Sequence, residues 1–246
     1  MRLENEVFVL TGASGGMGRE TVNRFLEEGA FVAALDLNVD SIEKTDRLLP
    51  IAVDLTKEEE VAKAFTEIND TFGRITGLVN IAGIAQPATP IEEVTLKEWE
   101  KIMSVNATAP FLTCREVTPY LKKQGEGVII NISSISMVRP RPGLNAYVAS
   151  KGAVVSFSQA LAIELAQYGI RVNVVNPGPA DTNMLGQFSA KDADIEATKD
   201  TIFKKSVPLG KLVQPIDIAN SLVYLCSKEA AIVTGSVLNV DGGRGI

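Results

Sequence analysis

Short apolar runs alternate with longer amphipathic stretches along the chain. The runs are Val7–Leu10, Phe31–Leu35, Ile51–Val53, Gly77–Ile81, Val128–Ile132, Arg171–Val175 and Val237–Val240. The stretches with helical periodicity between them are Gly18–Glu28, Lys57–Phe72, Leu96–Lys123, Ala146–Tyr168 and Pro215–Ser227. Runs that are apolar on both faces suit strands of a parallel sheet with helices on both sides. The alternation therefore predicts an α/β chain with a doubly wound parallel sheet and right-handed crossovers.

Size and charge narrow the class of protein. A chain of 246 residues suits a single domain that spans residues 1–246. The net charge is −6, and no run of Lys or Arg offers the basic surface that a nucleic-acid binder needs. The chain has no histidine, which excludes Ser-His-Asp catalysis and imidazole metal ligands.

The two cysteines, Cys114 and Cys226, lie far apart and outside any CxxC spacing. A disulfide framework and a cysteine-rich zinc site are not expected, so we predict no metal site and a reducing compartment. The first apolar run is four residues long, too short for a signal peptide. No apolar segment approaches the roughly 18 residues of a membrane span. We expect a cytoplasmic protein without a membrane partner.

A glycine-rich turn, Thr11–Gly18, follows the first predicted strand and leads into a helix. Glycine permits positive φ and close approach of a ligand to main-chain N–H groups, and a helix N-terminus favours a pyrophosphate. We therefore predict dinucleotide binding, although a tight turn without a ligand is the alternative. The contacts expected in this turn are Gly12, Ser14, Gly16, Met17 and Gly18.

Asp36 and Leu37 follow the second predicted strand, and Asp36 lies 18 residues after Gly18. A carboxylate there can accept hydrogen bonds from ribose hydroxyls and repels a 2′-phosphate. Neither Gly15 nor Leu37 is basic, so nothing at those positions would hold that phosphate. The sequence predicts NAD(H) over NADP(H); an Asp that caps a turn is the alternative.

Asp54 and Leu55 end the third predicted strand. An Asp there could meet the adenine amino group, or it could cap the helix that starts near Lys57. The sequence does not decide between these roles, although Thr56 is the better capping residue.

Tyr147 and Lys151 lie four residues apart and share one face of a predicted helix. A tyrosine hydroxyl has a pKa of about 10, too high for efficient acid/base work near neutrality. A nearby ammonium favours the phenolate and lowers that pKa, so the pair predicts a tuned general acid/base. An aromatic stem beside a solvated lysine is the alternative.

Two further positions are candidates on weaker grounds. Ser134 follows the run Val128–Ile132 and could steady a substrate carbonyl beside the phenol, or it could simply form a turn. Pro110 cannot donate to the carbonyl of Asn106 and displaces it, which predicts a kink and a freed acceptor that can hold a water. A simple kink is the favoured interpretation from the residues alone.

The segment 182–210 is polar, charged and weakly periodic. A loop of that length in a compact domain is usually a lid or a binding loop. We predict that it binds substrate; surface decoration is the alternative.

The ordered motifs resemble the short-chain dehydrogenase/reductase family along essentially the whole chain. They are Thr11-Gly12-x3-Gly16-x-Gly18, Asn80-Ile81-Ala82-Gly83, Asn106, Ser134, Tyr147-x3-Lys151, Asn176-Pro177-Gly178 and Asp241-Gly242-Gly243. The resemblance implies a single-domain Rossmann fold with a parallel sheet of about seven strands. One departure is Ile81, because the family stretch is often Asn-Asn-Ala-Gly.

By this resemblance Tyr147 is the catalytic acid/base, and Lys151 lowers its pKa and holds the nicotinamide ribose. Ser134 positions the substrate oxygen, and Asn106 supports a water chain from Lys151 to solvent. The family also implies homotetramers, formed through the helices around 96–123 and 146–168 and the C-terminal segment. The further cofactor contacts that it implies are Asn80, Ala82, Gly83, Pro177, Gly178, Ala180 and Thr182.

The predicted substrate pocket is walled mostly by small or apolar residues, and it includes Ser134, Ser136, Tyr147 and Pro179. Its other expected walls are Ala85, Gln86, Met137, Val138, Leu144 and part of 182–210. Arg139 and Arg141 could meet an anionic group, but solvated loop charges or subunit contacts are the favoured interpretation. The predicted substrate is a secondary alcohol or ketone of modest size, and sugars, cyclic alcohols, hydroxy acids and steroid-like rings are open alternatives.

Three functions follow for test. The leading one is an NAD-dependent oxidoreductase that interconverts a secondary alcohol and a ketone. The second is a 3-oxoacyl-thioester reductase acting on acyl-carrier-protein substrates; Asp36 argues against it because such reductases usually take NADPH. An acidic carrier would also need a basic docking patch, which the charge of −6 does not suggest. The third is a non-catalytic NAD(H)-binding redox sensor.

Overall fold

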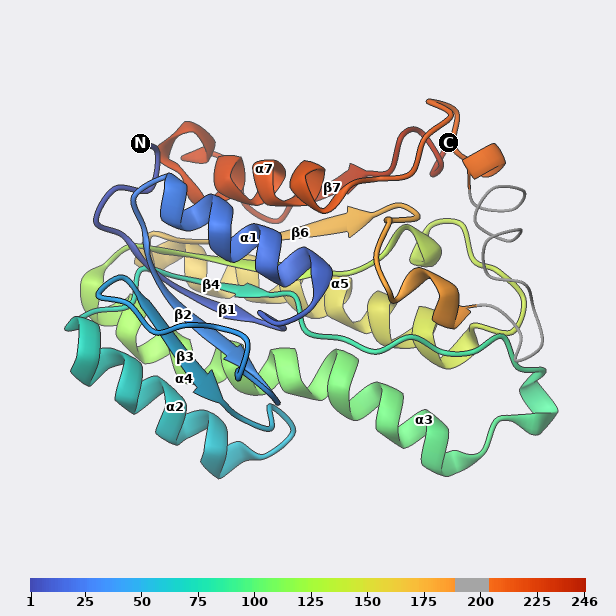
Figure 1. The fold of residues 1–246 in the computed structure, drawn as a ribbon, viewed down its shortest axis with the longest axis horizontal. Helices are drawn as coiled ribbons and strands as arrows, with labels where there is room; N and C mark the ends of the chain where they lie inside the picture. The colour runs from blue at the N-terminus through green and yellow to red at the C-terminus, as the bar shows by residue number, and fades with distance from the viewer. Residues whose placement is uncertain (189–203) are drawn as a thin grey trace.

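A single seven-stranded sheet organises the computed structural model, which describes residues 1–188 and 204–246. The strand order is β3-β2-β1-β4-β5-β6-β7, and every neighbouring pair is parallel. The order reverses direction between β1 and β4, which is the topological switch point of a doubly wound sheet. Figure 1 shows the strands in the middle layer with helices on either side. The predicted Rossmann fold is confirmed.

The elements follow one another in β-α-β alternation. The strands are β1 (Val7–Thr11), β2 (Phe31–Asp36), β3 (Leu48–Ala52), β4 (Gly77–Asn80), β5 (Gly127–Ile132), β6 (Ile170–Pro177) and β7 (Val237–Val240). The α-helices are α1 (Gly16–Glu27), α2 (Glu58–Phe72), α3 (Leu96–Met103), α4 (Ala109–Gln124), α5 (Asn145–Leu165) and α7 (Pro215–Cys226).

Two apolar cores lie on opposite faces of the sheet, because successive strand residues point to opposite sides. On one side, Phe8 and Leu10 of β1 belong to the core that includes Phe25 of α1 and Leu222 of α7. On the other side, Val9 of β1 belongs to the core formed with α2, α4 and α5. Figure 1 shows α1 and α7 together on one face of the sheet. Burial on both faces explains the unbroken apolar runs in the sequence.

Two predicted elements differ from the structure. The third strand begins at Leu48 and ends at Ala52 rather than spanning 51–53, because Leu48 and Leu49 pair with β2. The predicted helix 96–123 is interrupted by a π-helical turn, Ser104–Thr108. Pro110 lacks the N–H that a regular α-helix would use to bond Asn106, so the predicted break at this point is confirmed.

The parallel strands end at one edge of the sheet, and this edge places the candidate residues. Thr11, Asp36, Asn80, Ile132 and Pro177 are the last residues of five strands. Ligands of open α/β sheets bind at this edge beside the switch point. In the described part of the chain, no helix has the length and apolar character needed to cross a membrane.

Candidate active site

A cavity of about 590 Å³ runs along the carboxyl edge of the sheet. Twenty of the residues predicted from the sequence line it: Gly12, Ser14, Gly16, Met17, Gly18, Asp36, Leu37, Asp54, Leu55, Ala82, Gly83, Ser134, Ser136, Tyr147, Lys151, Pro177, Gly178, Pro179, Ala180 and Thr182. Asn80 and Asn106 do not line it, and neither do four of the predicted pocket walls, Ala85, Gln86, Met137 and Val138. Among these predicted residues, the cavity brings together positions as far apart as Gly12 and Thr182.

The glycine-rich turn forms one end of this cavity. Gly12 has φ +69°, and a Cβ there would lie 2.7 Å from the backbone nitrogen of Ala82. A Cβ at Gly18 would overlap the carbonyl oxygen of Gly12. Both positions thus require glycine for packing. A Cβ at Gly16 would lie 3.3 Å from the Thr182 methyl group, so the segment after β6 closes over this turn.

Asp36 is fixed by two backbone amides at the end of β2. The Ser14 N–H donates to Asp36 Oδ2 at 2.9 Å, and the Leu37 N–H donates to Oδ1 at 2.7 Å. Its carboxylate is held facing the cavity that the glycine turn also lines. Arg19 lines this end as well, and its guanidinium donates to Ser41 Oγ at 3.0 Å. The sequence analysis considered Gly15 and Leu37 as places for a basic group and missed Arg19.

Asp54 forms a local turn. Its Oδ1 accepts from the Thr56 N–H at 2.9 Å and from the Thr56 hydroxyl at 2.6 Å, and these bonds hold the pKa of Asp54 below its usual value. The N-cap residue of α2 is Lys57, without a side-chain cap bond, so the predicted capping role is wrong for both Asp54 and Thr56. Asp54 also lines the cavity, and its contact with adenine stays a prediction.

Asn80 is part of the protein interior. Its amide oxygen accepts from the Thr113 hydroxyl at 2.8 Å, and its amide nitrogen donates to Asn131 Oδ1 at 2.8 Å. Only 3% of the residue is exposed. The predicted cofactor contact is therefore corrected: Asn80 joins β4, β5 and α4 below the cavity floor. The floor itself is formed by the next residues, and Thr11 Oγ1 accepts from the backbone N–H of Ala82.

Tyr147, Lys151 and Ser134 converge at the other end of the cavity. Residues 147 and 151 lie one turn apart on α5, and Ser134 follows β5. The Ser134 side chain lies close enough to the Tyr147 phenol to lower its pKa. The Lys151 ammonium donates to the carbonyl of Ile132 at 3.0 Å and lies 5.9 Å from the centroid of the Tyr147 ring.

Burial dominates the protonation of this group. It raises the pKa of Tyr147 to about 12, against the lowering effect of the Ser134 side chain, and it lowers the pKa of Lys151 to about 8. The prediction that Lys151 lowers the pKa of the phenol does not hold for the protein alone, because the ammonium is directed to a carbonyl and is itself desolvated. At neutral pH the phenol is protonated.

Asn106 supports the wall of the cavity from behind. It is fully buried in the π-helical turn, its amide oxygen accepts from the Ile84 N–H at 2.8 Å, and its amide nitrogen donates to Ser150 Oγ at 3.2 Å. A Cβ at Gly83 would lie 3.3 Å from Asn106 Oδ1 and 3.4 Å from Lys151 Nζ. Asn106 and Lys151 therefore meet at Gly83, and the predicted water relay between them is not tested by these contacts.

The predicted binding segment 182–210 is described at its two ends, and 189–203 lie outside the described residues. At the first end, the ring of Phe188 packs edge-on against that of Tyr147, with centroids 4.9 Å apart. Leu144 lines the cavity, as predicted. Gln86 does not line it, and its amide oxygen instead accepts from the Tyr147 N–H at 2.9 Å and anchors the start of α5.

Two arginines, Arg141 and Arg244, line the cavity together with Tyr147 and Ser134. Arg141 lies at the cavity wall with intermediate exposure, so contact with an anionic group and the favoured interpretation as a solvated loop charge or subunit contact both stay predictions. Arg139 is exposed and does not line the cavity. The sequence did not identify Arg244 as a site residue. It lies three residues after Asp241 in the last predicted motif, and nothing in that local sequence indicates that its side chain reaches the cavity.

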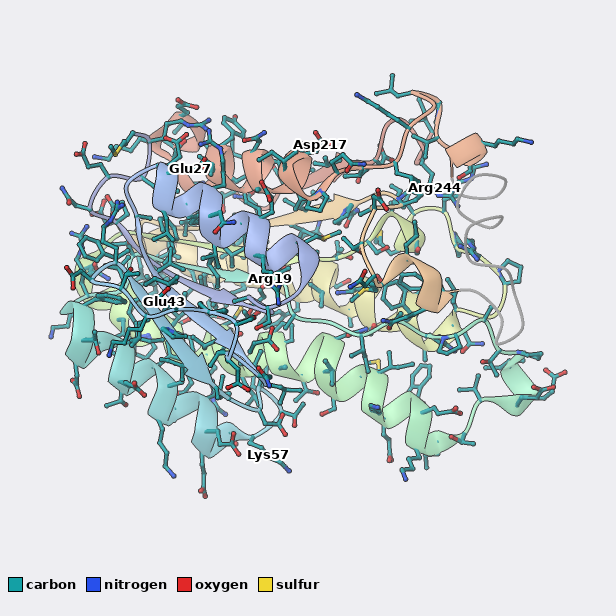
Figure 2. All side chains as sticks on the ribbon, viewed as in Figure 1. Arg19, Glu27, Glu43, Lys57, Asp217 and Arg244 are labelled. Carbon is teal, nitrogen blue, oxygen red and sulfur yellow. The ribbon has the colours of Figure 1, made fainter. Side chains whose placement is uncertain are left out.

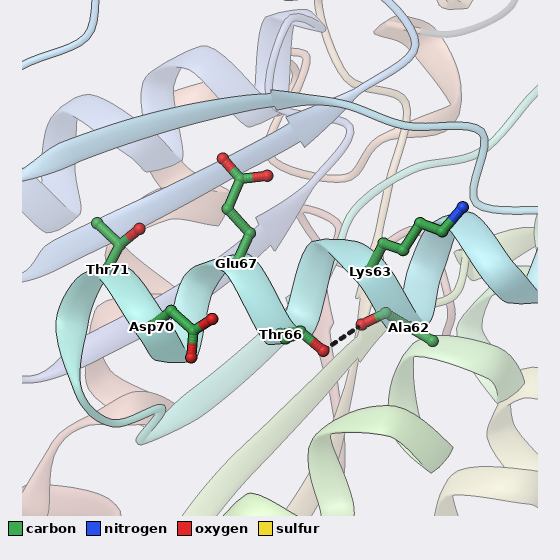
Figure 3. Close-up of a pocket in the computed structure, with 6 residues that line it drawn as sticks. All are labelled: Ala62, Lys63, Thr66, Glu67, Asp70 and Thr71. Carbon is green, nitrogen blue, oxygen red and sulfur yellow. Dashed lines mark hydrogen bonds between the residues drawn. The ribbon is translucent and has the colours of Figure 1, made fainter.

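A second hollow lies on the outward face of α2 (Figure 3). Its walls all come from this one helix, and the Thr66 hydroxyl donates to the carbonyl of Ala62 within it. Lys63, Glu67 and Asp70 are solvent-exposed. Because it gathers no groups from separate elements, this hollow is not a candidate for chemistry.

Comparison with known proteins agrees with this geometry. The family model described as enoyl-(acyl carrier protein) reductase matches residues 12–244. The 3-oxoacyl-(acyl-carrier-protein) reductase of Thermotoga maritima is 35% identical over 251 residues, covering 99% of each chain. The 2-(S)-hydroxypropyl-CoM dehydrogenase 3 of Xanthobacter autotrophicus is 34% identical, covering 98% of this chain and 97% of that one.

A solved structure gives the same result. The 3-ketoacyl-(acyl-carrier-protein) reductase of Brucella melitensis, complexed with NADH, superimposes with a TM-score of 0.92 and 38% identity, covering 99% of this chain and 100% of that one. The fold and the cavity define a Rossmann-type oxidoreductase that uses a nicotinamide dinucleotide. The chain belongs to the short-chain dehydrogenase/reductase family, and it acts on CH–OH groups and the corresponding carbonyls.

Proposed function

We propose that this protein is an NAD(H)-dependent dehydrogenase that interconverts a secondary alcohol and a ketone, with Tyr147 as general acid/base. The observation that carries the proposal is the convergence of the Tyr147 hydroxyl, Ser134 and the Lys151 ammonium at one end of a cavity whose other end holds Asp36 and the glycine turn. One cavity thus offers a dinucleotide cradle and a proton donor.

The cradle fits the cofactor. The glycine turn presents main-chain groups at the N-terminus of α1, which suits a pyrophosphate. Asp36 is placed to accept the ribose hydroxyls and to repel a 2′-phosphate, which favours NAD(H). Lys151 would hold the nicotinamide ribose, and Pro177, Gly178, Ala180 and Thr182 would surround the nicotinamide. When bound, the nicotinamide supplies or accepts the hydride at the carbinol carbon.

The side chains supply the proton and the orientation. In ketone reduction the Tyr147 phenol donates its proton to the carbonyl oxygen, and the Ser134 hydroxyl hydrogen-bonds the same oxygen. The raised pKa keeps the phenol protonated at neutral pH, which is the form that reduction requires. Alcohol oxidation runs the same proton path in reverse, with the Tyr147 phenolate as the base that accepts the proton of the alcohol.

The experiment follows NADH absorbance over a panel of ketones, oxo-sugars and acetoacetyl thioesters with wild type and Tyr147→Phe. We expect Tyr147→Phe to lower kcat about a thousandfold and to leave NADH affinity, measured by cofactor fluorescence, within about twofold. Tyr224→Phe, at an exposed tyrosine, is the matched control. Full activity of Tyr147→Phe on a true substrate would show that another group is the acid, and NADH binding without any turnover would favour the redox-sensor function.

A second candidate is reduction of 3-oxoacyl thioesters. The relatives from Thermotoga and Brucella support it, because both are named as reductases of this kind. The Brucella protein is complexed with NADH, so a preference of Asp36 for NAD(H) does not argue against this function. The acetoacetyl thioester arm of the panel decides: a kcat/KM for the thioester well above that for every simple ketone would support this candidate.

The quaternary structure we propose is a homotetramer. Ile163 of α5 is 83% exposed and Phe111 of α4 is 43% exposed, although both side chains are apolar. Exposed apolar groups on two adjacent helices suit a subunit interface. Light scattering is expected to give the mass of four chains of 26.3 kDa, and the mass of one chain would refute the proposal.

We also propose a cytoplasmic location and a single catalytic domain over 1–246. Cys114 and Cys226 are both free thiols in buried positions, which suits a reducing compartment. Fractionation of the host cell tests the location, and limited proteolysis that released a separately folded fragment would contradict a single domain.

A further inference from the structure

Two cationic side chains from distant segments meet at the substrate end of the cavity. Arg141 lies in the segment before α5, and Arg244 lies two residues before the last residue, Ile246. Both line the cavity with Tyr147, Ser134 and Ser136. Figure 2 labels Arg244 beyond the end of β7, near the carboxyl edge of the sheet where the cavity lies.

Arg244 is buried without full compensation. The residue is 6% exposed, and its Nη1 has no hydrogen-bond partner among the described residues. None of the ion pairs found in residues 1–188 and 204–246 involves it. A buried guanidinium is costly unless an anion accepts its hydrogen bonds. The side chain is therefore poised to bind an anion that the described chain does not provide.

The neighbouring carboxylate is already occupied. Asp241 Oδ1 accepts from the Gly243 N–H at 2.9 Å, and Asp241 Oδ2 accepts from the Gly245 N–H at 2.7 Å. These bonds shape the C-terminal turn and hold Arg244 in position. Asp241 thus attracts the guanidinium through space but forms no ion pair with it.

Other positive charges gather at the same place. The Arg139 guanidinium donates to the carbonyl of Arg244 at 3.0 Å and tethers this turn to the segment after β5. Burial together with the charges of Arg139 and Arg141 lowers the pKa of Arg244, whereas Asp241 raises it. The potential at this end of the cavity is therefore positive although the chain carries a net charge of −6.

We infer that Arg244, assisted by Arg141, binds an anionic group of the substrate, so that the substrates are oxo acids and hydroxy acids with a carboxylate, sulfonate or phosphate. A guanidinium presents paired donors that match such groups. The inference rests on the proposed function, because the anion is held in the cavity that contains Tyr147. A small substrate is favoured over an acidic carrier protein, since a side chain that is 6% exposed cannot reach carboxylates on a protein surface.

The experiment uses matched acids and amides: 3-oxobutanoate, 4-oxopentanoate and 5-oxohexanoate, each with its neutral amide, assayed with NADH. The three lengths allow for the distance between the carbonyl and the anion. We expect wild type to prefer at least one acid over its amide by tenfold or more in kcat/KM, which is the value of one charge-assisted contact. Arg244→Gln should lower this acid-to-amide ratio at least tenfold, and Arg141→Gln by a smaller factor.

Arg74→Gln, at an exposed arginine before β4 on the opposite edge of the sheet, is the matched control and should leave the ratio unchanged. Arg244→Lys retains the charge and should keep part of the preference, which guards against a folding defect in Arg244→Gln. Equal ratios in wild type and Arg244→Gln would overturn the inference. A change of oligomeric mass in Arg244→Gln with an unchanged ratio would also overturn it, by assigning the guanidinium to a subunit contact.

Calorimetric titration of the same acids and amides into the protein with NADH separates this inference from the proposed reaction. Arg244-dependent binding of the acids without turnover would support the anion site and refute the reaction. Turnover of ketones with no preference for any acid, in rate or in binding, would support the reaction and refute the anion site.

Discussion

The two ends of the cavity are built in different ways. The cofactor end uses backbone groups and glycines from consecutive elements: the turn after β1, the end of β2 and the end of β3. The substrate end uses side chains from four separate segments, represented by Ser134, Tyr147, Phe188 and Arg244. The first end is formed mainly by neighbouring β-α-β units, whereas the second forms only when segments that are distant in the sequence come together.

This difference separates binding from selectivity. Close approach of backbone to ligand at Gly12 and Gly18 leaves little room for variation, and it serves a cofactor that many enzymes share. The substrate end depends on side chains that can be exchanged without changing the sheet, so it can vary among chains with one fold. Three substitutions test this comparison. A result that differs from the one we expect would contradict the role given to that residue.

The largest effect is expected at the cofactor end. Asp36→Ser removes the carboxylate that we propose repels a 2′-phosphate, so the ratio of kcat/KM for NADPH to that for NADH should rise about a hundredfold. Steady-state kinetics with both cofactors and one substrate measure it. Asp40→Ser is the control, since it removes the same charge from an exposed site outside the cavity. An unchanged ratio would mean that Arg19 or another group sets the preference.

The next effect tests whether Asn80 belongs to the site or to the interior. Asn80→Ala removes one acceptor of the Thr113 hydroxyl and one donor to Asn131 Oδ1 in a buried position, so we expect a loss of about 2 kcal/mol in the free energy of unfolding. NADH affinity should stay within about threefold. Urea denaturation and cofactor fluorescence measure the two quantities, with the exposed Asn220→Ala as control. Weaker NADH binding at unchanged stability would restore Asn80 as a cofactor contact.

The smallest effect concerns the buried Lys151. Its pKa of about 8 lies below the usual 10.5, so between these values the folded protein binds fewer protons than the unfolded chain. Stability should therefore rise with pH in this window, by about 1 kcal/mol per pH unit, as the cost of burying the ammonium disappears. Below pH 8 that cost is fully present.

Lys151→Met should remove this pH dependence, and Lys63→Met, at an exposed lysine of α2, should retain it. The comparison is made by urea denaturation of the cofactor-free protein from pH 7.5 to 10. Parallel pH profiles of wild type and Lys151→Met would show that the ammonium is solvated rather than buried.

The sequence predicted most of the fold because apolar periodicity reports burial on both faces of the sheet. It misplaced β3, because Pro50 and the short run Ile51–Val53 concealed the pairing of Leu48 and Leu49 with β2. It also predicted the break near Asn106, because a proline removes a specific hydrogen bond wherever it occurs.

The site was predicted less evenly. Family motifs identified residues at both ends of the cavity. They did not show that the Asn80 side chain hydrogen-bonds to Asn131 in the interior, or that the buried Asn106 accepts a hydrogen bond from the Ile84 N–H. The direction in which a buried amide points depends on partners from other elements. The same holds for the pKa of Tyr147, which follows from its burial rather than from its spacing to Lys151.

The amino-acid order alone determined the parallel sheet, the glycine-rich turn and the placement of Tyr147 and Lys151 one turn apart on a helix, because each depends on neighbours within a few residues or on a repeated pattern of burial. Only the tertiary structure decided that Arg244, near the end of the chain, would share a cavity with Arg141 and Tyr147. The physical reason is that a side chain's charge partners and desolvation are set by segments distant in sequence, and these are placed only when the sheet assembles.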